Sequence, residues 1–404
     1  MNINDLNDDC LKQVFSWLSF RDKVKCQRVC KLWKTIIFQV FTQQLFFKTT
    51  DSFERCTSET LSLVLKKVIK YCINLKAIEI NDSSIDENIL QMVFNKLKRL
   101  NVLWLRNREN FNKSLLKVFI NCKNSVKLTE LHISNQNIDD NSLEVVIKNC
   151  PHLKFLNVSK NDNITGKSSL QYLSSSLKSL DISECRYIRE DGFQCLISGE
   201  GTNLSELKFG TYVSKQIIEN ISKNLKSLTK LHINAYYYPK SFISDDLSSI
   251  SRLERLEHLY VHNLLPLLQN NFDNTFSQIL IGLNKLKTLS LIVTQISDNS
   301  LKYLAKYCPK LESFEYQYSS YKTVVNTDLT DEGALYLSQI KSLRKLSITG
   351  TAFTEKSLSH LIQHNSSLVF IYLSNCKNIS ESNIISLIKQ REANCKNKIF
   401  FEFN

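Results

Sequence analysis

Three short stretches contain residue types that carry chemistry in other proteins, and none of them completes its motif. Residues 165–168 read Thr-Gly-Lys-Ser, like the end of a phosphate-binding loop, but Asn161 stands where that loop needs its first glycine. Residues 199–201 read Gly-Glu-Gly and lack the third glycine of a dinucleotide-binding turn. Cys26 and Cys30 are four residues apart, with no second Cys/His pair at zinc spacing. The sequence therefore predicts no catalytic residues, no cofactor and no metal site.

A second set of candidates consists of aromatic, histidine and polar residues that flank the second leucine of a recurring L-x-x-L-x-L pattern. In an extended strand these flanking residues point away from the core, and exposed aromatic side chains are typical of protein-binding surfaces. An isolated surface aromatic without a partner is the alternative for each of them. His258 and His262 lie about 13 Å apart along one strand, which is too far for shared metal ligation. The predicted target-binding residues are Trp104, Arg106, His132, Phe155, Asn157, His232, His258, Tyr260, His262 and Tyr372.

The leucine pattern that positions these residues recurs through most of the chain. Its first residues are Leu75, Leu100, Leu128, Leu153, Leu177, Leu204, Leu228, Leu256, Leu286, Leu311, Leu343 and Leu368. Their spacing of 24 to 32 residues is the period of leucine-rich repeats. One strand and one helix cannot bury their apolar residues alone, so each copy must stack on the next.

The predicted fold is therefore α/β, a leucine-rich-repeat solenoid of about 12 repeats. Parallel strands lie about 4.8 Å apart whereas packed helices need about 8 to 10 Å, so we expect a horseshoe with its sheet on the concave side. Residues 399–403 alternate like a closing strand. We expect insertions at residues 236–239, 264–271 and 316–328, where the period breaks, and insertions in solenoids often lie near the binding surface.

The expected helix starts support the repeat independently of the leucines. Hydroxyl residues, usually followed by an acid, precede the helical apolar residues of several repeats, and such residues cap helices and favour the positive end of the helix dipole. The stretches are Ile164-Thr165, Ile296-Ser297-Asp298, Leu329-Thr330-Asp331, Phe353-Thr354-Glu355 and Ile379-Ser380-Glu381.

Composition restricts the partners and the compartment. The chain has 404 residues, of which 43% are hydrophobic, but no apolar run is long enough to span a bilayer, and acids near the start argue against a secretory signal. We expect a cytoplasmic and/or nuclear protein, with its 12 cysteines as structural thiols. The net charge of +13 comes from scattered lysines, so a solvated basic exterior is favoured over nucleic-acid binding.

The first forty residues do not follow the repeat period. Leu11, Val14, Phe15 and Leu18 share one helical face, and two further short helical segments follow. A polar stretch separates them from residues 58–72, which have one apolar face and suit a cap for the open end of the solenoid. The predicted domains are residues 3–43, a linker and capping helix at 44–71, and repeats at 72–404.

The N-terminal segment resembles the F-box family. The resemblance lies in Leu6-Asn7-Asp8-Asp9-Cys10-Leu11, Val14-Phe15-Ser16-Trp17-Leu18, Arg21-Asp22 and Val29-Cys30-Lys31-Leu32-Trp33, which match the family's pattern almost throughout. The departure is Asn7, where the family usually has proline, so the preset φ of that turn is lost. A plain helical cap for the solenoid is the alternative interpretation.

An F-box followed by leucine-rich repeats resembles the substrate receptors of SCF-type cullin-RING ubiquitin ligases. That resemblance implies a non-catalytic subunit whose F-box binds a Skp-type adaptor and whose concave face presents a target for ubiquitination and proteasomal degradation. It implies adaptor-binding roles for Leu6, Asn7, Leu11, Val14, Phe15, Leu18, Val29, Cys30 and Trp33. The alternatives are a repeat scaffold or small-GTPase regulator without a ligase role, and a binder of nucleic acid or anionic lipid whose affinity falls steeply with salt.

Overall fold

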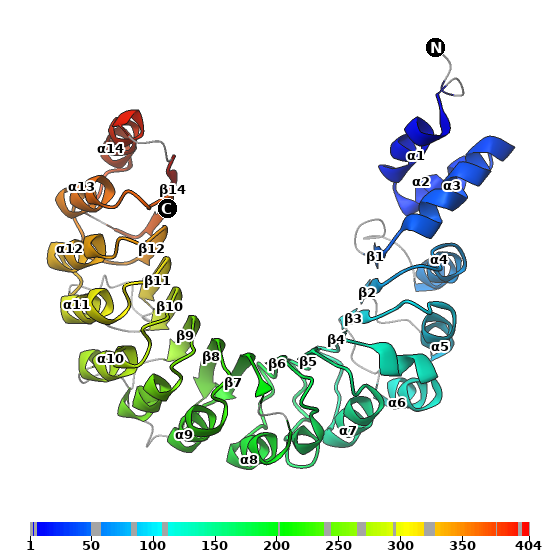
Figure 1. Cartoon of the computed structure of the whole chain (residues 1–404), viewed down its shortest axis with the longest axis horizontal. Coiled ribbons are helices and arrows are strands. Elements are labelled where there is room, and N and C mark those ends of the chain that lie inside the picture. Colours follow the sequence, from blue (N-terminus) through cyan, green and yellow to red (C-terminus); the bar gives the residue numbers. More distant parts are fainter. Residues whose placement is uncertain are drawn as a thin grey trace. The chain divides into compact units, whose positions relative to one another are not determined.

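The computed structural model describes residues 3, 6–49, 58–81, 87–106, 112–200, 203–237, 244–264, 272–293, 296–318, 328–376, 378–394 and 398–403. The chain divides into two compact units, residues 1–177 and 178–404. In each unit the strands line the concave side and the helices the convex side (Figure 1). Among the described helices, none has the length and apolar character needed to cross a bilayer.

The first unit begins with three helices, α1 (Asp8–Ser16), α2 (Phe20–Cys26) and α3 (Lys31–Gln43). Parallel strands β1 (Phe46–Lys48), β2 (Ala77–Asn81), β3 (Val102–Arg106), β4 (Glu130–His132) and β5 (Phe155–Asn157) then pair in chain order. The connecting helices are α4 (Ser58–Tyr71), α5 (Glu87–Lys96), α6 (Asn112–Asn121) and α7 (Asp140–Asn149), with 3-10 segments η2 (Lys123–Lys127) and η3 (Leu170–Tyr172).

The second unit contains β6 (Ser179–Asp181), β7 (Glu206–Tyr212), β8 (Lys230–Tyr237), β9 (His258–Leu264), β10 (Thr288–Val293), β11 (Ser313–Tyr318), β12 (Lys345–Thr349), β13 (Phe370–Ser374) and β14 (Phe400–Phe403). These strands also pair in parallel and in chain order. Its helices are α8 (Glu190–Ser198), α9 (Lys215–Asn224), α10 (Phe272–Ile281), α11 (Asp298–Tyr307), α12 (Asp331–Gln339), α13 (Glu355–His364) and α14 (Glu381–Asn394), with the 3-10 segment η5 (Ser244–Arg252).

The predicted solenoid of leucine-rich repeats is confirmed. Each of the twelve leucine triplets starts at or just before one of the strands β2–β13, and its first residue is at most 4% exposed. The closing strand appears as β14. The buried thiols also fit the prediction: Cys72, Cys150 and Cys308 are at most 2% exposed, and burial raises the pKa of Cys72 and of Cys308 to about 12.

Three local predictions differ from the structure. The segment after Thr165 forms only the short η3, and Gly166, which follows Thr165, has a φ of 78°, outside the helical region. Residues 46–48, expected in a linker, form β1 and extend the sheet. Tyr316, expected to start an insertion, is fully buried because it is the third member of its triplet. The other expected insertions fall mostly outside the described residues.

Neighbouring repeats are joined by an acid at the start of one helix and the hydroxyl residue that begins the next. Asp331, the first residue of α12, accepts hydrogen bonds from the backbone N–H of Thr354 at 2.8 Å and from its hydroxyl at 2.7 Å. Asp298 of α11 accepts the same pair from Thr330. Two further pairs repeat both bonds, Asp140–Thr165 and Asp273–Ser297, whereas Glu355 accepts from the Ser380 amide and Glu190 is hydrogen-bonded to the Ser214 side chain. We call this contact the acid–cap link.

We expect Asp331→Ala to lower the free energy of unfolding by about 1 to 2 kcal/mol, because the partly buried amide and hydroxyl of Thr354 lose their acceptor. Urea unfolding at pH 7 measures this. Glu381→Ala is the matched control, since Glu381 opens α14, the last described helix, and caps no following repeat. Equal losses in the two variants would mean that Asp331 acts only through the dipole of its own helix.

The same pair of proteins tests the pH dependence of the link. Burial alone would raise the pKa of Asp331, but hydrogen bonds from Ser357 and Thr354 hold it below its ordinary value. A carboxylate with a lowered native pKa contributes stability above its unfolded pKa and loses it as pH falls through the native value. The difference in unfolding free energy between wild type and Asp331→Ala should therefore shrink below about pH 4. A constant difference down to pH 2 would contradict the link.

Candidate functional site

The N-terminal helices form a small core around two residues of α1. Leu11 is 0% exposed and Phe15 is 1% exposed, and the Phe15 ring meets the Trp33 ring edge to face at 4.9 Å between centroids. This contact joins α1 to the first turn of α3. The predicted adaptor-binding residues Leu11, Phe15 and Trp33 therefore stabilise the helices. Leu11 and Phe15 are buried and have no surface for a partner.

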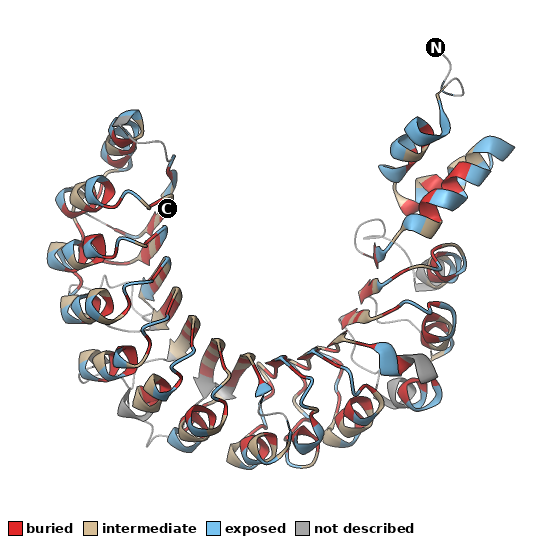
Figure 2. Ribbon diagram, viewed as in Figure 1, coloured by how far each residue is buried: buried red, intermediate tan, exposed pale blue. Residues whose placement is uncertain are grey.

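Five large apolar side chains of residues 8–43 face solvent instead, and one of them is Phe38 of α3, at 48% exposed. Val14 is 40% exposed, Trp17 83%, Val29 61% and Leu32 41%. These four flank the Phe15–Trp33 contact in sequence, at the end of α1 and the start of α3, whose outer surfaces are exposed (Figure 2). We call these four residues the apolar face. Exposed apolar side chains grouped in this way mark interaction surfaces, and tryptophan dominates their energetics.

Asn7 and Cys30 have local roles as helix caps. Asn7 has φ of −67°, the value that proline would impose, and its side-chain oxygen accepts a hydrogen bond from the Cys10 amide at 2.8 Å. The residue in place of the usual proline therefore keeps the turn and caps α1. The Cys30 thiol accepts from the Trp33 amide at 3.4 Å and begins α3. Leu6 and Leu18 are partly exposed beside these turns.

The helices are packed directly on the first strands. The Phe20 ring lies 5.0 Å from Phe41 and 5.6 Å from Phe47 of β1, and Phe41 stacks on Tyr71 of α4 at 5.6 Å. Lys23 of α2 is only 8% exposed; its ammonium donates to the Ser16 carbonyl, and burial lowers its pKa. The segment thus covers the end of the repeats through α2 and α3 and leaves its apolar face open.

On the concave side of the first unit, three of the predicted residues meet. Trp104 of β3 lies 4.8 Å from His132 of β4, and His132 stacks on Phe155 of β5 at 4.6 Å. The Glu130 carboxylate accepts hydrogen bonds from Trp104 Nε1 at 2.9 Å and His132 Nε2 at 2.8 Å. Asn157 is a local residue whose oxygen accepts from the Ser159 amide and hydroxyl. The Arg106 side chain lies outside the described residues.

On the concave side of the second unit, the predicted histidines also gather, with polar partners. His232 of β8 lies 4.8 Å from His262 and 5.4 Å from Tyr260, both of β9. His262 bonds the Ser290 hydroxyl at 2.9 Å, and that hydroxyl donates to Glu315. His258 bonds Thr288 at 3.0 Å, whereas Tyr372 lies four strands away on β13. We call His232, His258, Tyr260 and His262 the histidine cluster.

His232 of the histidine cluster is neutral at physiological pH. Burial is the main cause that lowers the pKa of His232, to about 4, helped by nearby His262, Lys208 and Lys230. Burial also lowers the pKa of His258 and of His262. The two lysines are held by one carboxylate, Glu206, at 3.5 and 3.1 Å. Among the described residues no three His, Cys, Asp or Glu side chains are grouped to hold a metal ion.

Residues 3–40 match the F-box domain family model. These residues form an F-box domain. The motif contains both core residues (Leu11, Phe15) and surface residues (Val14, Val29), and it does not separate them by type. Trp17 and Leu32 were not among the predicted adaptor-binding residues, and the structure places both at the surface.

Three solved structures resemble the chain. A chain in the crystal structure of the Rad7 and Elc1 complex in yeast is 17% identical, with a TM-score of 0.52 over 93% of this chain and 90% of that chain. An internalin (InlF) from Listeria monocytogenes str. 4b F2365 is 16% identical, with a TM-score of 0.43 over 82% of this chain and 92% of that one. A chain in the TLR13–ssRNA13 complex is 17% identical, with a TM-score of 0.47 over 78% of this chain and 41% of that chain. The chain in the yeast complex therefore has a fold similar to that of the protein described here.

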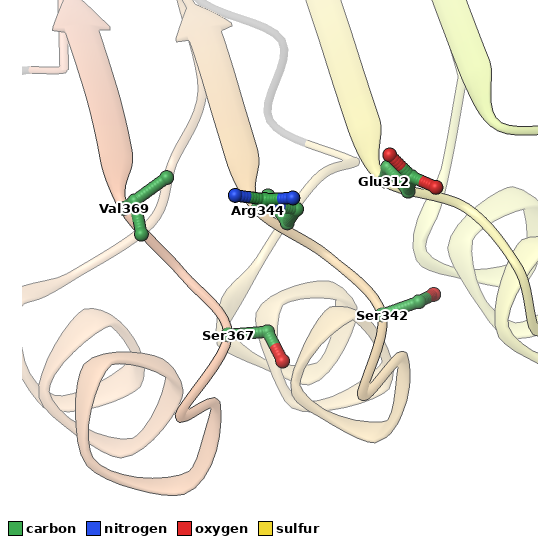
Figure 3. A pocket seen from close by; sticks show the side chains of 5 residues that line it. All are labelled: Glu312, Ser342, Arg344, Ser367 and Val369. Carbon is green, nitrogen blue, oxygen red and sulfur yellow. The ribbon is translucent and has the colours of Figure 1, made fainter. Parts of the chain in front are cut away.

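One pocket of about 310 Å³ lies where β11, β12 and β13 begin (Figure 3). Its lining residues are Glu312, Ser342, Arg344, Ser367 and Val369. Glu312 and Arg344 are both exposed, so neither charge is tuned by burial, and the described lining contains no nucleophile paired with a base. The pocket therefore has no arrangement for catalysis.

We expect the histidine cluster to make stability fall in mild acid. The unfolded His232 takes up a proton near pH 6.5, but the folded one does so only near pH 4, so the unfolded state gains protons first and folding weakens between these values. Replacing His232 by Phe should remove on the order of 1 to 3 kcal/mol of this pH-dependent loss. Urea unfolding at pH 7 and pH 4.5 measures it; identical losses in both proteins, or an NMR titration of His232 above pH 6, would contradict it.

Proposed function

We propose that this F-box protein is the substrate-recognition subunit of an SCF-type ubiquitin ligase. Its F-box would bind a Skp-type adaptor and, through it, a cullin-RING ligase. The concave face of the repeats would hold a target protein for ubiquitination and proteasomal degradation. Such a receptor would work in the cytoplasm or nucleus and would itself catalyse nothing, because its contribution is to position the target.

The main support for adaptor binding is that the apolar face is exposed although the core of the F-box is already complete. Leu11 and Phe15 are fully buried without any partner, so the exposed Val14, Trp17, Val29 and Leu32 are not needed to close the F-box. Burying a Trp side chain removes roughly 150 to 250 Å² of surface from water, which suits an interface anchor. The named structural neighbour with the same fold is a complex of Rad7 with Elc1, which supports partner binding by this architecture.

Packing of the F-box on the repeats supports the positioning role. Phe20, Phe41, Phe47 and Tyr71 form one aromatic series from α2 through α3 to β1 and α4. Asn74 Nδ2 adds a hydrogen bond to the Thr42 carbonyl at 2.8 Å. An adaptor on the apolar face would therefore be connected to the first repeats through packed side chains. Fixed geometry of this kind raises the effective concentration of a bound target near the ligase.

We expect Trp17→Ala combined with Val14→Ser to weaken binding of a Skp-type adaptor at least tenfold, because both side chains are exposed in the free protein and would be buried in the complex. Isothermal titration of the purified full chain with the adaptor measures this. Tyr187→Ala is the matched control, since Tyr187 is 58% exposed in the other unit and should leave the affinity unchanged.

The same variants distinguish a ligase receptor from a scaffold or GTPase regulator that uses the repeats alone. Deleting residues 1–43 would be a poor test, because it would expose Phe47 and Tyr71 and destabilise the first repeats. The exposed-face variants leave that packing in place. Failure of the folded wild-type protein to bind any Skp-type adaptor would overturn the receptor function.

A further inference from the structure

The concave side of the first unit carries a continuous series of rings. Phe46 of β1 lies 6.3 Å from Trp104 of β3, Trp104 lies 4.8 Å from His132, and His132 stacks on Phe155 at 4.6 Å. Together with Glu130 we call these residues the aromatic patch. Between Phe46 and Glu130 the pairing register places only Ala77 and Val102, whose short side chains let Trp104 reach Phe46.

The patch is available to a partner. Phe46 is 43% exposed, and Trp104 and Phe155 are partly exposed. The rings lie on four strands, β1, β3, β4 and β5, of the unit that also contains the F-box. In the second unit the equivalent positions of β10 hold the polar Thr288 and Ser290, whereas those of β9 hold His258 and Tyr260. Rings concentrated on one part of a concave sheet are the usual source of binding energy at interfaces.

Glu130 gives this patch a chemical preference. One of its oxygens, Oε1, accepts both ring N–H groups, from Trp104 and His132, so the rings fix the carboxylate between them. The side chain remains 31% exposed, and its recorded ion-pair partner among the described residues is His132, which is charged only when protonated. The second oxygen keeps its acceptor capacity. A negative charge thus stands among aromatic rings in a protein whose net charge is +13.

We propose that the aromatic patch binds an arginine side chain of the target protein; this inference rests on the proposed receptor function. A guanidinium is planar, stacks on aromatic rings and donates to a carboxylate at the same time, whereas an ammonium acts as a point charge. Glu130 would accept from the guanidinium, and Trp104 or Phe155 would cover its face. Cation–π contact with a desolvated ring contributes up to about 2 kcal/mol, and the charge-assisted bond adds to it.

Other occupants fit the patch less well. An acidic or phosphorylated segment would place its charge against Glu130. A purely apolar segment would cover the carboxylate without a new partner, and an unpaired charge that loses water is strongly unfavourable. The arginine would be the anchor, with neighbouring apolar residues of the target covering Phe46 and Val102.

The test uses the full chain, with and without a Skp-type adaptor, and a library of fluorescent nonapeptides in which one central position is fixed. We expect arginine to be the preferred fixed residue, and the best arginine peptide to bind at least tenfold more tightly than the same peptide with citrulline, which has the same shape without the charge. Glu130→Gln, which keeps the size and an acceptor, should weaken the arginine peptide about tenfold and leave the citrulline peptide unchanged.

Phe155→Ala is a second variant, which removes a ring without touching the carboxylate, and it should also weaken the arginine peptide. Tyr187→Ala, an aromatic-to-alanine change at an exposed site of the other unit outside the predicted target-binding residues, is the control and should have no effect. Preference for acidic, phosphorylated or apolar peptides, equal binding of arginine and citrulline peptides, or no binding at all would overturn the inference.

Adaptor binding is measured in the same samples. Adaptor binding without arginine preference would remove the inference and leave the receptor function standing. Arginine preference without adaptor binding would support the arginine site and remove the receptor function.

Discussion

The acid–cap link is the contact on which the repeats depend. A helix that starts in a repeat leaves backbone amides without helical partners, and in most proteins the cap residue of that same helix satisfies them. Here a cap residue such as Thr330 accepts from the Glu332 amide of its own helix, and its own amide and hydroxyl donate to Asp298 of the preceding helix. The cap residue is therefore bonded to both helices, which fixes the spacing between them. Because each strand follows its helix by a short connection, this spacing also sets the parallel register that carries the concave side chains.

The sequence analysis predicted the parts of this arrangement that are local or periodic. Leucine spacing located strands β2–β13, since burial of one face fixes which residues point inward. Hydroxyl and acid residues indicated the helix starts, but their neighbour across the repeat lies about 25 positions away, and nothing in a local pattern states that Asp331 belongs to Thr354. The short η3 and the strand β1 were missed because neither has a local pattern: Gly166 takes a positive φ before η3, and β1 is defined by its pairing with β2.

The F-box shows a different limit. The motif was evident from residue types, yet Phe15 and Trp17 are two aromatic residues two positions apart, one 1% exposed and the other 83% exposed. Which of them faces inward depends on where α3 crosses α1, and that crossing is fixed by the Phe15–Trp33 contact. A pattern of residue types therefore locates a binding domain without identifying its contact residues. Phe46 and Glu130 were not among the predicted contact residues for the same reason. Their role in the aromatic patch depends on side chains of β3 and β4 that are distant in sequence.

The two concave clusters differ in how far their polar groups are already engaged. In the histidine cluster, His258 and His262 are bonded to hydroxyls on the next strand, and the nearby lysines are shared by Glu206. A ligand there would have to break bonds that the free protein has made, and the return is small when one hydrogen bond replaces another. In the aromatic patch, rings are partly exposed and the one carboxylate has acceptor capacity left. Binding there removes apolar surface from water and completes the coordination of a charge, so it gains free energy from both terms.

The same unit carries the apolar face of the F-box, and α2 and α3 join that unit's helices to its first strand through the contacts of Phe20 and Phe41. A target held at the patch and an adaptor held at the apolar face would therefore be related by one packed set of side chains, without any contribution from the second unit.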